Sequence, residues 1–397
     1  MKRSPLALIW LTVFIDLIGF GIIIPILPLY ADRHGATPLQ IGILLGSYSA
    51  MQFVFAPLLG SLSDRVGRKP VLAVSLYGTA LASITLGFAS ALPHALWLIF
   101  AARIVDGITG ANIATAQAYV ADVTTEDKRA RGMGLLGMAF GLGFVLGPAI
   151  GGILAAIDIS LPFYVVGALA IGNATAMLFY LPEPERHLSV AVEARSRFSR
   201  LAAAWRDERT RLLLLIFLLS SSAFSAMEAT LALLLKARFQ FSPSDTAFVF
   251  VFIGLVLAAV QGGLVGRLVD KVGERPLVVL GLALLVVGLG LLGLPLPTNL
   301  GVLLPSVAVL AAGSALLTPS ITALVSRRSP AAAQGASLGV AQSMNSMGRI
   351  VGPVVGGLLY GFGWSLPYIV GAAVMASGLG LAIYYNAMDS RPEPARS

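Results

Sequence analysis

The eleven residues from Gly60 to Pro70, GSLSDRVGRKP, place one acid and three bases between two long apolar runs. The phrase returns as GRLVDKVGERP from Gly266 to Pro276, with the same residue at six of eleven positions. A second phrase repeats at nearly the same spacing, LGPAIGG at 146–152 and VGPVVGG at 351–357. Two repeats at one offset predict that the chain is a duplication of a single unit.

The apolar runs on either side of these phrases predict a membrane protein. The 397 residues are 57% hydrophobic and 12% charged, whereas soluble domains are about 25% charged. Segments of about 20 apolar residues can each cross a hydrocarbon core about 30 Å thick as a helix. They lie at 6–30, 39–60, 71–91, 95–119, 132–156, 161–181, 210–235, 246–266, 277–297, 299–325, 335–359 and 364–386. The first is kept as a helix because it is too long for a signal peptide and carries Asp16.

We therefore predict an all-α membrane protein of twelve transmembrane helices in two parallel six-helix repeats. The expected domains are an N-terminal bundle, 1–181, a cytoplasmic linker, 182–209, and a C-terminal bundle, 210–397. In the linker, Phe198, Leu201, Ala202 and Trp205 share one helical face. This pattern indicates either a helix on the lipid surface or a flexible linker.

The distribution of bases predicts the orientation. Most of the 27 Lys and Arg residues fall in loops on the side that carries both termini, whereas Arg33, Lys236 and Arg238 fall on the other side. The positive-inside rule then places both termini in the cytoplasm. We expect the protein in the plasma (inner) membrane. The net charge of +8 fits attraction to anionic lipid and does not indicate a nucleic-acid partner.

The charged phrase has the composition of a short, stiff connection between two helices. Gly60 and Gly67 permit close backbone approach and a tight turn, while Arg65 and Arg68 suit cytoplasmic anchoring. Asp64 does not serve anchoring, so it needs a partner such as an arginine or the N-terminus of a neighbouring helix. With Asp270 in the second copy, we expect a gating latch in each half; the alternative is an ordinary solvated turn.

The same residues resemble a known family. The spacing from Gly60 through Leu62, Asp64, Arg65, Gly67 and Arg68 to Lys69 resembles the loop signature of the major facilitator superfamily. Gly134, Gly143, Gly147-Pro148 and Gly151-Gly152 match the antiporter signature of that superfamily. SAMQFVFAPLLGSLSDRVGRKPVL and RIVDGITGA also look like the tetracycline/proton antiporters and their drug-efflux relatives. The resemblance implies antiport, and the physics alone predicts a small-residue packing face at 143, 147 and 151 with a bend at Pro148.

Charges inside the marked segments are candidates for function because each is costly in the bilayer. They are Asp16, Arg103, Asp106, Glu228 and Arg349. Asp16, near mid-membrane, is the leading proton carrier, which the efflux relatives also imply. Arg103 and Asp106 are spaced to pair locally, and the alternative is that Arg103 exchanges between Asp106 and Asp16. Glu228 could bind a cationic substrate, carry a second proton or pair with Arg349.

Polar residues in the same segments are the candidate substrate contacts. They are Gln52, Asn112, Gln117, Gln342 and Asn345, together with Glu228 and Arg349. The tetracycline exporters carry further membrane acids in their third and ninth helices. Here the third helix has Ala82 at that position and the ninth has none. The resemblance therefore favours a drug or metabolite other than tetracycline.

The sequence thus predicts a secondary active transporter that exports a small amphipathic compound or drug in exchange for protons by alternating access. The alternative is a proton or sodium symporter, or a uniporter of a small metabolite, with the same fold. We expect no enzyme, because no catalytic or phosphate-binding motif is found. No cofactor or metal site is expected, since the chain has no cysteine and three dispersed histidines. The resemblance suggests a monomer.

Overall fold

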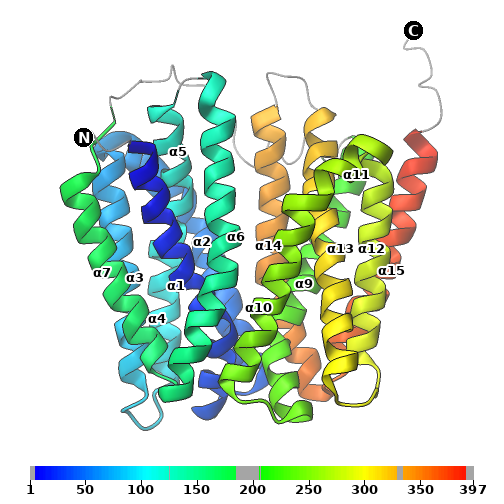
Figure 1. The fold of residues 1–397 in the computed structure, drawn as a ribbon, viewed down its shortest axis with the longest axis horizontal. Coiled ribbons are helices and arrows are strands. Elements are labelled where there is room, and N and C mark those ends of the chain that lie inside the picture. The colour runs from blue at the N-terminus through cyan, green and yellow to red at the C-terminus, as the bar shows by residue number, and fades with distance from the viewer. Residues whose placement is uncertain (1–4, 125, 185–204, 206, 329–333, 390–397) are drawn as a thin grey trace. The chain divides into compact units, whose positions relative to one another are not determined.

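The computed structural model describes residues 5–124, 126–184, 205, 207–328 and 334–389 (Figure 1). The described residues form helices and no strand. The first half contains α1 (Pro5–Arg33), α2 (Pro38–Val66), α3 (Arg68–Ala89), α4 (Leu96–Thr109), η1 (Gly110–Asn112), α5 (Ile113–Val123), α6 (Glu126–Ile157) and α7 (Leu161–Tyr180). The second half contains α9 (Glu208–Phe239), α10 (Pro243–Ala259), η2 (Val260–Leu264), α11 (Val265–Val272), α12 (Glu274–Gly293), α13 (Leu300–Arg327), α14 (Gln334–Phe362) and α15 (Leu366–Asp389).

Eleven membrane-length apolar spans are found among the described residues. The remaining long helix, α14, has 29 residues and corresponds to the eleventh predicted segment, 335–359. It contains the polar residues Gln342, Asn345 and Arg349. The all-helical membrane fold is confirmed. The proposed surface helix of the linker falls almost wholly on residues outside the described ranges.

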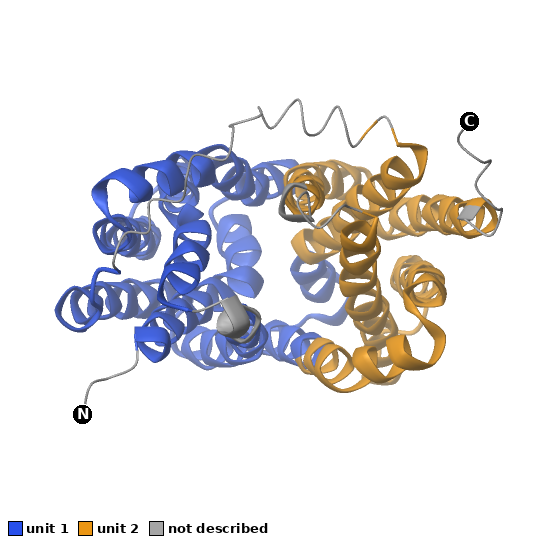
Figure 2. Ribbon diagram, turned by 90° about the horizontal axis from the view of Figure 1, so that it is seen from above, with its two compact units in different colours: residues 1–190, 231–254 blue, residues 191–230, 255–397 orange. Residues whose placement is uncertain are grey.

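The chain forms two compact units, shown in blue and orange in Figure 2. Unit 1 contains residues 1–190 and 231–254, and unit 2 contains residues 191–230 and 255–397. The boundary therefore runs through α9 after Thr230 and through α10 after Gly254. The last turns of α9 and the first turns of α10 pack with the first seven helices, although they follow the linker in the sequence.

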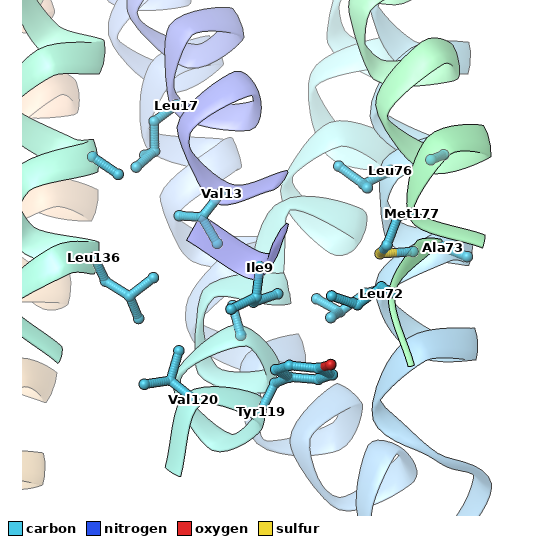
Figure 3. Packing of buried hydrophobic residues seen from close by; sticks show 14 residues of the cluster. Ile9, Val13, Leu17, Leu72, Ala73, Leu76, Tyr119, Val120, Leu136 and Met177 are labelled. Carbon is cyan, nitrogen blue, oxygen red and sulfur yellow. The ribbon is translucent and has the colours of Figure 1, made fainter. Parts of the chain in front are cut away.

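The core of unit 1 surrounds α1. Ile9, Val13 and Leu17 on α1 are buried against side chains of α3, α5, α6 and α7 (Figure 3). Polar bonds fix the helix register within this core, since Trp10 Nε1 donates to the carbonyl of Leu135 at 3.0 Å and Asn173 Nδ2 donates to the carbonyl of Thr12 at 2.8 Å. α1 is therefore held between α6 and α7.

The segment expected as one helix at 95–119 is interrupted. α4 ends at Thr109, a 3₁₀ turn covers Gly110–Asn112, and α5 continues from Ile113. Ala111 has φ −74° and ψ 19°, outside helical values. An interruption inside a membrane segment releases backbone carbonyls that must find other partners. This turn lies beside the acidic side chain of α1 described below.

Candidate functional site

A buried polar cluster forms in unit 1 where the 3₁₀ turn meets α1. Asp16 of α1 is half-buried, and Asn112 of the turn donates from Nδ2 to its Oδ2 at 3.3 Å. Asn112 is itself buried. Asp106, one turn before the break, lies close enough for its charge to interact with that of Asp16. Two carboxyl groups therefore share one interior site.

Arg103 supplies the positive charge of this cluster. Its Nη1 lies 2.6 Å from Oδ2 of Asp106, and both side chains are almost fully buried. The guanidinium also stacks on the ring of Tyr48 of α2, with 4.2 Å from Cζ to the ring centroid. Its buried Nε makes no hydrogen bond. The local pair expected from the i, i+3 spacing is present, with an aromatic face that stabilises the cation.

Two glycines of the RIVDGITGA stretch bring α2 close to this pair. A Cβ on Gly107 would lie 2.7 Å from the carbonyl oxygen of Tyr48, and one on Gly110 would lie 2.7 Å from its hydroxyl. Gln52, one turn after Tyr48, donates from Nε2 to the carbonyl of Gly110 at 2.9 Å. Gln52 therefore satisfies a carbonyl released by the 3₁₀ turn, and this contact accounts for a glutamine inside the membrane segment.

The structure brings together five of the predicted residues in unit 1, which are Asp16, Gln52, Arg103, Asp106 and Asn112. Gln117 lies apart from them on α5, with an exposed side chain. Aromatic rings border the cluster, since Phe20 of α1 lies 5.6 Å from the ring of Tyr48 and 6.0 Å from that of Phe144 on α6. The cluster therefore has a charged side and an aromatic side.

In unit 2, Glu228 of α9 interacts electrostatically with Arg349 of α14. This interaction agrees with one of the three roles that the sequence left open for Glu228, that of a partner of Arg349. Asn345 lies one turn before Arg349, and Ser221 of α9 donates to its Oδ1 at 2.7 Å. Gln342 is exposed. Close packing joins the same two helices, because a Cβ on Gly348 would lie 2.5 Å from Cβ of Ser221.

The glycines of the antiporter signature form a packing face on α6. A Cβ at Gly143 would lie 2.8 Å from Cβ of Leu17, one at Gly147 would lie 2.6 Å from Cα of Gly21, and one at Gly151 would lie 3.0 Å from the carbonyl of Ile22. All three face α1, and Pro148 lies inside the same helix. A Cβ at Gly134 would meet nothing within 4 Å. The signature residue Gly134 therefore has no packing role in unit 1.

The first charged phrase is a clamped turn. Gly67, with φ 123°, separates α2 from α3 and requires glycine. Arg68 contacts Asp64 at 2.5 Å and Asp122 of α5 at 3.0 Å, so Asp64 has its partner within its own phrase. Arg65 lies in the last turn of α2. Gly60 lies inside α2, and a Cβ there would meet nothing within 4 Å, so the close approach expected at Gly60 is wrong.

The N-terminus of α3 is capped by a residue that the sequence analysis did not single out. Glu183, three residues beyond α7, accepts from the backbone N–H of Arg68 at 2.5 Å and of Lys69 at 3.0 Å. A carboxylate at a helix N-terminus is stabilised by the free N–H groups and the helix dipole. Its position directly after an apolar helix, between Pro182 and Pro184, was the available signal.

The second charged phrase forms the same turn with reversed charges. Gly273, with φ 78°, separates α11 from α12. Glu274 takes the place that Arg68 has in the first copy and pairs with Arg327 at the end of α13 at 2.7 Å. Asp270 is exposed on α11. In both copies the residue after the glycine therefore pairs with a neighbouring helix. The first copy has a base paired with Asp122, and the second has an acid paired with Arg327.

The other end of unit 1 contains contacts that join the two halves of the sequence. Lys236, near the end of α9, contacts Asp32 of α1 at 2.6 Å. Ser244 of α10 donates to the carbonyl of Gly152 at 2.5 Å. A Cβ on Gly254 would lie 2.8 Å from the carbonyl oxygen of Phe144, so α10 packs closely on α6. We refer to the contacts of Asp32–Lys236 and Ser244–Gly152 as the α9–α10 closure.

Comparisons with known proteins agree with these features. The family model of the Major Facilitator Superfamily matches residues 9–264 and 256–397. The chain is 32% identical to the tetracycline resistance protein, class C, of Escherichia coli, covering 94% of this chain and 95% of the relative. It is 29% identical to multidrug resistance protein 2 of Bacillus subtilis (strain 168), covering 94% and 93%.

Solved structures with the same arrangement of helices include two transporters. The human organic anion transporter MFSD10 matches with a TM-score of 0.68 and 26% identity, covering 96% of this chain and 99% of that one. The nucleoside transporter NupG matches with a TM-score of 0.78 and 13% identity, covering 98% and 100%. The latter identity shows the fold alone. With a duplicated helical unit, both signature phrases and a family model that spans almost the whole chain, this protein belongs to the major facilitator superfamily.

Proposed function

We propose that this transporter exports a small amphipathic compound or drug in exchange for protons. Support comes from relatives that include both tetracycline and multidrug resistance proteins and from the antiporter signature on α6. No phosphate-binding motif is found in the sequence, so the proposed energy source is an ion gradient. We further propose a monomer in the inner membrane, with both termini cytoplasmic as the distribution of bases predicts.

This proposal rests on one observation: the interior acids Asp106 and Asp16 have different kinds of partner. Asp106 is paired with a buried guanidinium at 2.6 Å, so its negative charge is balanced. Asp16 receives only a neutral amide at 3.3 Å, and no base among the described residues forms an ion pair with it. An isolated carboxylate is costly inside a membrane, and taking up a proton removes that cost. Asp16 is therefore the proposed proton carrier.

Arg103 is the proposed link between the proton and the conformational change. The charge of Asp106 acts on Asp16, and the guanidinium of Arg103 is shared between Asp106 and Tyr48. When Asp16 is deprotonated, two carboxylates compete for one nearby cation. A shift of Arg103 toward Asp16 would then change the contact between α2 and α4. Its unbonded Nε leaves a donor available for that second acceptor.

The surroundings of the cluster suit an amphipathic substrate. Phe20, Tyr48 and Phe144 supply aromatic faces, while Asp16 and Gln52 supply an acid and an amide. Aromatic rings next to a carboxylate favour organic cations and zwitterions over anions. A cation that binds at Asp16 competes with the proton, and this competition is a sufficient basis for exchange.

Alternating access is the proposed mode of movement. The α9–α10 closure joins α1 and α6 to helices that continue into unit 2. In the proposed orientation the Asp32–Lys236 pair lies on the outer side, where it must separate for release of substrate. The clamped turns after Gly67 and Gly273 are the proposed rigid connections on the cytoplasmic side.

The test is proton movement in inside-out vesicles that hold a proton gradient. A panel of lipophilic cations, neutral drugs and tetracycline is added to wild type, to Asp16→Asn and to Asp158→Asn, an acid in the loop between α6 and α7. We expect at least one compound to dissipate the gradient with wild type and with Asp158→Asn but not with Asp16→Asn. If labelled compounds cross while none dissipates the gradient, the proton antiporter is refuted in favour of a uniporter or sodium coupling.

A further inference from the structure

Tyr48 of α2 is fixed in place at both of its ends by glycines that follow Arg103. At the backbone end, a Cβ on Gly107 of α4 would lie 2.7 Å from the carbonyl oxygen of Tyr48 and 2.8 Å from Cβ of Met51. At the ring end, a Cβ on Gly110 of the 3₁₀ turn would lie 2.7 Å from the hydroxyl oxygen of Tyr48 and 3.2 Å from its Cζ. A side chain at either glycine would displace the tyrosine, so the bare backbone of this segment determines where the ring lies.

Two further side chains restrict the ring. Nε2 of Gln52 lies 3.5 Å from the hydroxyl of Tyr48 while it donates to the carbonyl of Gly110 at 2.9 Å. The ring of Phe20 lies 5.6 Å from that of Tyr48, at an angle of 31°. Tyr48 is also buried. Its ring is therefore a preorganised surface, held before any cation binds to it.

The face of this ring contacts the guanidinium of Arg103, with 4.2 Å from Cζ to the ring centroid. The side chain of Arg103 is almost fully buried, and cation–π contacts are strongest where water is excluded. Nη1 of the same guanidinium donates to Asp106 at 2.6 Å, whereas its buried Nε makes no hydrogen bond. Asp106 and the ring of Tyr48 thus hold the cation together.

Asp16 is the other acid that can attract this cation. The charge of Asp106 acts on Asp16, so the two carboxyl groups lie in one electrostatic environment. The other charged residues of helices α1 to α7 lie near the helix ends, at 32–33, 64–69 and 122–131. In the middle of these helices two acids therefore compete for Arg103.

We propose that Tyr48 is a positioning residue, whose ring holds Arg103 beside Asp106 and keeps this cation from Asp16, so that Asp16 can take up a proton. The inference deepens the proposed function and rests on it for the role of Asp16 in exchange. The two placements of Arg103 are populations in equilibrium, and the strength of the ring contact determines their ratio. A weaker ring face moves the population toward Asp16, where the guanidinium favours the ionised carboxylate.

The test separates the π face of the ring from its shape. In full-length protein, Tyr48 is replaced by phenylalanines that carry one, two or three fluorine atoms, which withdraw negative charge from the ring face and change the ring's size little. Tyr48→Phe and Tyr48→Leu complete the series. The matched control is Phe163→Leu, which removes a fully buried ring that lies 4.7 Å from the ring of Tyr30.

The measurement is the protonation of the two acids. Each protein is reconstituted in liposomes and treated near neutral pH with dicyclohexylcarbodiimide, which reacts with carboxyl groups in their protonated form. Mass spectrometry then gives the rates of adduct formation at Asp16 and at Asp106 separately.

We expect Tyr48→Phe to react as wild type does. Each added fluorine should slow the reaction at Asp16 and speed it at Asp106, because Arg103 moves from the second acid to the first. Tyr48→Leu should show the full effect, about tenfold at Asp16, for loss of a buried cation–π contact. Loss of the fold would instead speed both reactions, and Phe163→Leu should change neither.

Equal rates across the fluorinated series would overturn the proposal. A change in Tyr48→Leu alone would also overturn it and assign Tyr48 to the packing of α2 on α4. Accumulation of substrate driven by a pH gradient is measured on the same series, and a decline that parallels the labelling of Asp16 supports the proposal and the proposed function together. If the labelling follows the series while wild type accumulates no compound, Tyr48 positions Arg103 and the proposed proton exchange fails.

Discussion

The packing of α6 on α1 predicts that only the glycines of α6 that contact α1 are sensitive to replacement by alanine. In Gly147→Ala, the new Cβ would lie 2.6 Å from Cα of Gly21 and 2.8 Å from the carbonyl oxygen of Ile18. Both are backbone atoms, so the two helices must move apart. Overpacking of this kind costs about 1–3 kcal/mol, offset by about 0.5–1 kcal/mol from the better helix propensity of alanine.

The matched control is Gly137→Ala in the same helix, where the new Cβ meets nothing within 4 Å. That variant should have the same gain of about 0.5–1 kcal/mol from helix propensity, so the two variants should differ by the overpacking cost, about 1–3 kcal/mol in the free energy of unfolding. For a unit of about 200 residues this corresponds to about 2–12 °C between their midpoints. Thermal unfolding of the purified proteins measures it. Equal midpoints would refute the assignment of Gly147 to a contact between helices.

Three further predictions concern the charged groups. Asp32→Lys should weaken the α9–α10 closure, so that positions near it react faster with a labelling reagent added from outside. The double variant Asp32→Lys with Lys236→Asp exchanges the two charges and should slow this reaction to the wild-type rate. Continued fast labelling in the double variant would contradict the Asp32–Lys236 ion pair. Glu183→Gln removes a charged cap from α3 and should lower the free energy of unfolding by about 1 kcal/mol, which lowers the unfolding midpoint. An unchanged midpoint would contradict the role of Glu183 as a cap. Hydrogen bonds from Ser160 lower the pKa of Asp158. The ionised carboxylate therefore stabilises the folded protein above about pH 4, and this stabilisation is lost on further acidification. Asp158→Asn should remove that part of the acid dependence of the unfolding midpoint.

The duplicated fold could be predicted from the sequence because membrane helices require long apolar runs and because two phrases repeat at one offset. The interruption at 110–112 could not. The neighbouring α2 shows why Gly107 and Gly110 are needed. Tyr48 occupies the space that their absent side chains leave, and this contact depends on tertiary structure.

The Arg103–Asp106 pair followed from spacing alone, since residues three apart on a helix share a face. The contact of Asp16 with Asn112 did not, because 96 residues separate them. The sequence placed both in the membrane without showing that a broken helix turns the amide toward the acid. Asp64 was expected to pair with an arginine or a helix N-terminus of a neighbouring helix, and its partner is Arg68, the first residue of α3, which also reaches Asp122.

The reversal of charge between the two turns shows what a repeat preserves. Arg68 and Glu274 have opposite signs, and a comparison of the phrases alone marks this position as a difference. In the folded units each pairs with a residue of opposite sign at the end of a neighbouring helix, Asp122 in one and Arg327 in the other. The interaction is preserved although neither residue type is.

The central claim, that Asp16 carries the exchanged proton, is tested most directly by two assays on one variant. Asp16→Asn is reconstituted in liposomes with a labelled substrate, and accumulation driven by a pH gradient is compared with substrate exchange at equal pH on both sides. We expect accumulation to be lost while exchange continues, because the neutral amide replaces the protonated acid and still allows the conformational change. Accumulation at the wild-type level in Asp16→Asn would contradict the account.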